Sequence, residues 1–100
     1  MNTSYYAVIF TSIKNEDVNG YSEMAEAMEK LAAKQPGYLG FESATGTPNI
    51  SISYWESLEA ITSWKHHADH LFAQQLGKTQ WYKKYRVRIC KVEKDYDFSA

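Results

Sequence analysis

The stretch from Gln35 to Lys78 reads Q-P-G-Y-L-G-F-E-S-A-T-G-T-P-N-I-S-I-S-Y-W-E-S-L-E-A-I-T-S-W-K-H-H-A-D-H-L-F-A-Q-Q-L-G-K, and its pattern decides the fold. The pair Pro36-Gly37 ends the helix that precedes it, because proline cannot donate the next backbone hydrogen bond. Residues 38–44 and 49–55 are strand-like, and the turn residues T-G-T-P-N join them as in a hairpin. Ser57 is then well placed to cap a helix. The stretch predicts two antiparallel strands that lead directly into a helix.

The residues on either side of this stretch supply the remaining elements. Tyr5–Ile13 is rich in β-branched and aromatic residues, which predicts a strand. Residues 21–35 predict an amphipathic helix, because apolar side chains recur at spacings of three and four residues. Trp81–Val92 predicts a last strand, in which apolar and basic residues alternate. The apolar positions of the first helix are Met24, Ala25, Met28, Leu31 and Ala32.

The helix that begins after Ser57 also carries an apolar stripe. We expect it to bend near residues 67–69, where Asp69 is placed to cap a separate short helix running to Gln75. Gly77 suits the residue that follows a helix end. The stripe consists of Leu58, Ile61, Trp64, Ala68 and Leu71.

The order of elements is therefore β-α-β-β-α-β. Because crossover connections are right-handed, this order favours an α+β, ferredoxin-like sandwich with an antiparallel sheet. The length of 100 residues fits a single domain over residues 1–100. The acidic end, about residues 96–100, is expected to be a short disordered tail.

Two helices can cover only one face of such a sheet, and the other face is unusually apolar. Strand one has Tyr6, Val8 and Phe10 on one side and Tyr5, Ala7 and Ile9 on the other. An apolar sheet face left open exceeds the patch that a monomer usually shows. The sequence therefore predicts a homodimer that packs sheet on sheet; the alternative is a monomer with scattered exposed aromatic residues.

Composition excludes several classes of function. The net charge of −1 offers no basic field for a nucleic-acid backbone. Cys90 is the only cysteine, so no intrachain disulfide can form. The N-terminal residues lack the pattern of a signal peptide, and no apolar run reaches the ~18 residues of a membrane span. We expect a cytoplasmic protein with no membrane or nucleic-acid partner.

The turn Q-P-G-Y-L-G-F-E-S and the segment S-Y-W-E-S-L-E-A-I-T-S-W-K-H-H-A-D-H-L-F-A-Q-Q-L-G resemble the antibiotic biosynthesis monooxygenase-like domain. The resemblance covers Tyr5 to Tyr96. It implies a dimeric α+β barrel, in which two ferredoxin-like protomers face each other through their sheets and each has a cavity between sheet and helices. Members include cofactor-independent oxygenases of quinones and phenols, quinol oxygenases and haem-degrading enzymes.

The haem-degrading members resemble one another in a first-strand asparagine, a second-helix tryptophan and a histidine about three turns beyond it. Trp64 matches the tryptophan. The first strand, Y-Y-A-V-I-F-T-S-I, has no asparagine, and the position ten residues past Trp64 is Gln74. Two of the three features are missing, which argues against haem oxygenation.

The histidines of the second helix are the natural candidates for chemistry. His66 and His70 share a helix face, as do His67 and His70, and such pairs can bind a divalent metal. Asp69, however, points away from that face, and no second group of ligands occurs elsewhere. The sequence predicts no metal site.

A general base is the better role for one of these histidines. Histidine is the residue type that commonly acts as a base near neutral pH, and His67 follows Trp64 by three residues, close to the apolar stripe. A phenol or hydroquinone, once deprotonated, can give electrons to oxygen without a cofactor if the protein supplies a base, a stacking wall and a dry cavity. The alternative is that His67 only packs at the helix bend or the dimer rim. The proposed substrate-binding residues are Trp64, Tyr54, Trp55, His70 and Tyr82.

Two classes of function remain open. The first is a homodimeric, cofactor-independent monooxygenase that acts on a small aromatic, phenolic or quinol-like compound. The second is a non-catalytic dimeric module that binds a small hydrophobic ligand, with haem as one option. No nucleotide-binding motif is present, so no cofactor is predicted.

Overall fold

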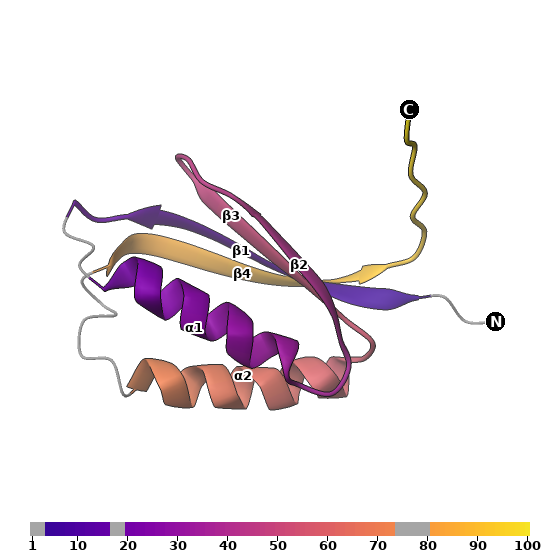
Figure 1. The fold of residues 1–100 in the computed structure, drawn as a ribbon, viewed down its shortest axis with the longest axis horizontal. Helices are drawn as coiled ribbons and strands as arrows, with labels where there is room; N and C mark the ends of the chain where they lie inside the picture. The colour runs from indigo at the N-terminus through magenta and orange to yellow at the C-terminus, as the bar shows by residue number, and fades with distance from the viewer. Residues whose placement is uncertain (1–3, 17–19, 74–80) are drawn as a thin grey trace.

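The computed structural model describes residues 4–16, 20–73 and 81–100, which form a four-stranded antiparallel sheet and two helices. Figure 1 shows both helices on the same side of the sheet. The sheet order is β2-β3-β1-β4, so the predicted β-α-β-β-α-β, ferredoxin-like fold is confirmed. The elements are β1 (Tyr5–Lys14), α1 (Tyr21–Ala33), β2 (Tyr38–Ala44), β3 (Asn49–Trp55), α2 (Leu58–Ala73) and β4 (Tyr82–Val92).

Helix α2 begins where the sequence predicts, but it does not bend as predicted. Ser57 Oγ accepts a hydrogen bond of 3.0 Å from the backbone N–H of Ala60, which confirms the predicted cap. The predicted bend near residues 67–69 is wrong, because α2 is continuous from Leu58 to Ala73. An ion pair between Lys65 Nζ and Asp69 Oδ2, at 2.8 Å, spans this point along one helix face.

Gly37 lies between α1 and β2 and packs against the start of α2. Its φ of +85° lies in the left-handed region, and an added Cβ there would come within 2.7 Å of the Ala60 Cβ. The Gly37 carbonyl also accepts a 2.8 Å hydrogen bond from the Glu56 N–H. Only glycine fits a turn that packs this closely on the first turn of α2.

The core lies at the end of the sheet where β3 leads into α2. Trp55 is fully buried against Ala32 and Ile61. Its indole N–H donates a 2.8 Å hydrogen bond to Ser53 Oγ, so the polar atom of this large side chain is satisfied inside the core. The core thus fastens the end of α1 and the start of α2 to β3.

The face of the sheet that points away from the helices is called the outer face below. Because opposed residues of an antiparallel pair share a face, Ile9, which pairs with both Ile52 and Arg88, marks this face on three strands. Its apolar residues are Tyr5, Ala7, Ile9, Ile13, Ile50, Ile52 and Tyr54. β4 adds Cys90, which is exposed and opposes Ala7, and the basic row, defined as Lys84, Arg86 and Arg88.

Residues 93–100 continue from β4 without regular secondary structure. Figure 1 shows this C-terminal segment rising on the side of the sheet opposite the helices. Neither helix of the described residues has the length and hydrophobicity that a membrane crossing demands.

Candidate functional site

A cavity of about 630 Å³ lies between the two helices and the inner, helix-facing side of the sheet. Val8 and Phe10 of β1 form part of its floor, and Met24 and Met28 of α1 form part of its roof. A volume of this size holds a small organic ligand. The cavity lies between the Trp55 core at one end and, at the other end, the contact of Tyr21 at the start of α1 with Tyr82 at the start of β4.

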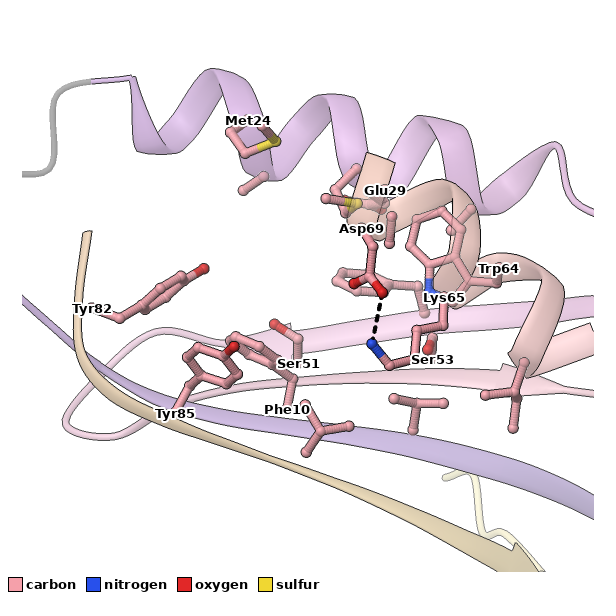
Figure 2. A pocket seen from close by; sticks show the side chains of 18 of the residues that line it. Phe10, Met24, Glu29, Ser51, Ser53, Trp64, Lys65, Asp69, Tyr82 and Tyr85 are labelled. Carbon is pink, nitrogen blue, oxygen red and sulfur yellow. Dashed lines mark hydrogen bonds and ion pairs between the residues drawn. The ribbon is translucent and has the colours of Figure 1, made fainter. Parts of the chain in front are cut away.

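One end of the cavity is built from aromatic rings. Phe10 stacks on Tyr85 with ring centroids 5.2 Å apart and meets the Tyr82 ring edge-on at 5.6 Å. Tyr21 of α1 also meets Tyr82 edge-on, at 5.8 Å. Figure 2 shows the hydroxyl groups of Tyr82 and Tyr85 directed into the cavity. We call Tyr21, Tyr82 and Tyr85 the tyrosine cluster.

Tyr82 is the most strongly perturbed member of this cluster. Burial raises the pKa of its phenol, and the neighbouring Tyr21 raises it further through its charge and a hydrogen bond. Tyr82 therefore keeps its proton well into the alkaline range. A neutral phenol at this position can donate a hydrogen bond to a ligand oxygen.

A β-bulge places Tyr82 and Tyr85 on the same face. The register of β4 against β1 shifts between Ile13 and Lys14, so that Lys14 opposes Tyr82 and Ser12 opposes Tyr85. In a regular strand, residues three apart would point to opposite faces. The extra residue in β4 turns Tyr82 toward the helices, the side that Tyr85 already faces together with Val87 and Ile89.

The opposite wall comes from α2. Trp64 lines the cavity and stacks on the buried Trp55, with ring centroids 5.8 Å apart and an interplanar angle of 21°. Lys65 and Asp69 follow on the same side of the helix, and their ion pair faces the cavity in Figure 2. Both charged side chains are more than half exposed, so they stand where the cavity meets solvent. The site thus combines aromatic walls with one charged pair at its mouth.

The structure brings two of the predicted site residues together, Trp64 and Tyr82. Trp55 is fully buried behind Trp64 and belongs to the core. Tyr54 points to the outer face, where its hydroxyl donates a 2.6 Å hydrogen bond to Glu42 Oε1. That bond raises the pKa of Tyr54 to about 12. The alternation of strand β3 separates Tyr54 from Trp55, so the two side chains cannot serve the same cavity.

The histidines do not face the cavity. His67 and His70 are exposed on α2, whereas the cavity is lined by Ile61, Trp64 and Ala68. On the continuous helix the cavity side runs through Ile61, Trp64 and Ala68, and His67 lies beside this line with its side chain exposed. Among the described residues, no three histidine, cysteine or acidic side chains form a group that could hold a metal ion. Gln74 lies outside the described residues.

Sequence reasoning missed several residues that line the site. Tyr21 and Tyr85 were not singled out, although tyrosine is a residue type that suits pockets. As a site residue, Asp69 was considered only as a metal ligand beside the histidines, and Lys65 was not among the predicted site residues. Their spacing of four residues was the available signal, because such a pair shares one helix face.

The fold and the cavity define a class: a ferredoxin-like α+β protein with a ligand-sized space between its sheet and its helices. The sequence pattern of the antibiotic biosynthesis monooxygenase family matches residues 4–76. The chain belongs to the antibiotic biosynthesis monooxygenase family.

Individual proteins agree with this assignment. The chain is 49% identical over 92 residues to the uncharacterized protein YqjZ of Bacillus subtilis (strain 168), covering 90% of this chain and 81% of that protein. A crystal structure of a variant of SnoaB, a cofactor-independent oxygenase from Streptomyces nogalater, matches with a TM-score of 0.64 and 12% identity, over 92% of this chain and 95% of that one. A dimeric ferredoxin-like protein of unknown function from Thermobifida fusca matches with a TM-score of 0.66 and 11% identity, over 92% and 95% of the two chains. At these identities the two structures show the fold alone.

Proposed function

We propose that this protein is a cofactor-independent monooxygenase of a small aromatic, phenolic or quinol-like compound. The observation that carries the proposal is the cavity of about 630 Å³, which joins aromatic walls to inward-directed phenol hydroxyls. A flat ring fits between such walls, and the hydroxyls fix the position of its oxygen atoms. The SnoaB neighbour, a cofactor-independent oxygenase, adds support from the family.

The substrate itself would supply the electrons in this reaction. One phenol O–H and one ring C–H are lost, one atom of O₂ enters the ring as a carbonyl oxygen, and the other leaves as water. The protein then has to bind the ring, favour its ionised form and limit the access of water. Trp64 offers an indole against the ring, and Tyr82 offers a hydrogen bond to a substrate oxygen.

The charged pair on α2 is suited to the ionisation step. A cation near a phenol favours the phenolate, and Lys65 Nζ stands at the cavity mouth. Asp69, 2.8 Å from Lys65, can pass the released proton to solvent because its side chain is exposed. The exposed position of His67 gives the role of base at this residue no geometric support, so the proposal assigns ionisation to the Lys65–Asp69 pair.

The proposed assembly is a homodimer formed through the outer faces. Ile9, Ile52 and Tyr54 lie at the centre of this apolar face, which the helices do not cover. A two-fold contact would bury the face against its own copy. The neighbour from Thermobifida fusca is described as dimeric, which supports a dimer of this fold. Light scattering should give twice the chain mass of 11.5 kDa, and a monomer at tens of micromolar would contradict the dimer.

Binding without turnover is the second candidate. It is favoured by the position of the histidines, because none of the described histidines lines the cavity. A hydrophobic ligand would use the same aromatic walls and need no base. Haem is one such ligand, and a titration without a Soret shift would remove it.

Oxygen uptake with a panel of hydroquinones and anthrone-like phenols separates the two candidates. We expect substrate-dependent uptake by the wild type and a loss of about a hundredfold in Trp64→Ala, because a misplaced ring loses its reactive geometry. His67→Ala is the matched control on the same helix and should keep its activity. Quenching of tryptophan fluorescence would show that the compounds bind. Binding without oxygen uptake above the buffer rate would favour the binding module.

A further inference from the structure

The helices leave the inner face of β4 open. Its three apolar side chains, Tyr85, Val87 and Ile89, line the cavity but keep exposed fractions of 61%, 47% and 50%. We call them the apolar row. β4 is also an edge strand, so one side of its backbone has no neighbouring strand among the described residues. Such an edge can accept another extended segment through backbone hydrogen bonds.

The C-terminal segment has the properties of a strand without a partner. Asp95 anchors its base by accepting a hydrogen bond from the Tyr5 hydroxyl. Beyond this anchor, Tyr96 and Phe98 are 89% and 88% exposed. Figure 1 shows the segment on the side of the sheet opposite the helices, whereas the cavity lies on the helix side. Two aromatic rings held in water favour any apolar surface within reach.

The side-chain pattern of this segment matches the pattern of β4. In an extended chain, Asp97 points to one face and its neighbours Tyr96 and Phe98 to the other. β4 carries the basic row on one face and the apolar row on the other. If residues 96–98 lie beside β4, Asp97 faces the basic row, and Tyr96 and Phe98 face the apolar row. Both kinds of cross-strand pair stabilise a sheet. Asp97 and the basic row take part in none of the ion pairs found among the described residues.

We infer that residues 96–98 of one copy add to the free edge of β4 in a second copy, where Tyr96 and Phe98 close the open side of the cavity. The inference rests on the proposed dimer, since it places the second copy on the outer face, the side on which the segment emerges. Each cavity is then completed by the other chain. A ligand enters or leaves when the short added strand detaches.

Cross-linking between two differently tagged chains tests the inference. In a Cys90→Ser background, one chain carries Phe98→Cys and the other Val87→Cys, so each has a single thiol and only intermolecular links can form. A short bis-maleimide reagent should give a product that contains one chain of each kind. In the matched control, the second chain carries Glu59→Cys, on the exposed surface of α2, in place of Val87→Cys. This pair should give little cross-linked product.

The outcomes separate the inference from the dimer that it needs. A dimeric mass with no mixed product above the control overturns the added strand and leaves the dimer in place. A monomeric mass overturns both. A mixed product in a dimer supports both.

A chain that ends at Asp95 provides a second test without new cysteines. In the wild-type dimer the added strand should slow hydrogen exchange at the amides of residues 85–89 by about fivefold relative to the shortened chain. Asp97→Lys should weaken this protection, and Arg88→Glu in the same chain should restore it. Equal exchange in the two dimers would overturn the inference.

Discussion

The two ends of the space between helices and sheet are built from similar residues but serve different purposes. At one end Trp55, Ala32 and Ile61 are buried together, and the helices contact the sheet directly. At the other end Tyr82 and Tyr85 line a cavity, although Tyr21 of α1 still contacts Tyr82. Both ends are aromatic. The difference teaches that stability and ligand binding are divided along one layer, according to whether side chains fill the space between the helices and the sheet.

Removing the Trp55 ring from the core should lower the free energy of unfolding more than any other change considered. Trp55→Ala leaves a cavity where the indole is fully buried and frees Ser53 Oγ from its hydrogen bond, so we expect a loss of about 3–5 kcal/mol in the free energy of unfolding. Urea denaturation measures it. A loss below about 1 kcal/mol would mean that the closed end does not hold the fold.

The turn that brings α1 against α2 should be the next most sensitive position. Gly37→Ala must accept a φ of +85° and a contact of 2.7 Å with Ala60 Cβ, so we expect a loss of about 1–3 kcal/mol. The control is Gly46→Ala, where the added Cβ would lie 3.6 Å from the Pro48 carbonyl oxygen and the change should be small. Equal melting temperatures for the two variants would contradict the role of Gly37.

Alkaline pH should lower the stability of the protein through the partly buried phenol of Tyr82, which lines the cavity. Above about pH 10 tyrosines ionise in the unfolded chain, whereas the raised pKa of Tyr82 keeps its phenol protonated in the folded protein. The unfolded state then binds fewer protons, so stability falls as the pH rises from about 10 toward the higher folded pKa. Tyr82→Phe should lose less stability than the wild type over this window. Parallel stability profiles in the two proteins would contradict the burial of this phenol.

The smallest effect on folding is expected at the rim of the open end. Tyr85→Ser changes a side chain that is 61% exposed, so the free energy of unfolding should fall by less than about 0.5 kcal/mol. The same variant should weaken the binding of an aromatic ligand several-fold, because one wall of the cavity is gone. Unchanged affinity, measured by fluorescence titration, would exclude Tyr85 from the site.

The fold could be predicted from local signals in the sequence. Pro36-Gly37, the turn before Asn49 and the cap at Ser57 each act within a few residues, and the hairpin and helix lie where they predict. These features need no knowledge of distant contacts. The resemblance to the family is confirmed by the match over residues 4–76.

The site depended on geometry that local signals do not carry. Trp64 was found because the helical stripe points inward. The bulge in the pairing of β1 with β4 brings Tyr82 onto the face that holds Tyr85, and local signals do not show this because register is a property of two strands. His67 was favoured because it follows Trp64 by three residues, beside the apolar stripe, but on the continuous helix its side chain is exposed.

Cys90 gives the outer face a natural chemical reporter. Its thiol is exposed in the single chain and opposes Ala7 on the face proposed for association. If two copies cover this face, a thiol reagent reaches Cys90 only during dissociation. The rate of its modification should therefore fall as the protein concentration rises, which would let the unmodified protein report its own affinity for a second copy.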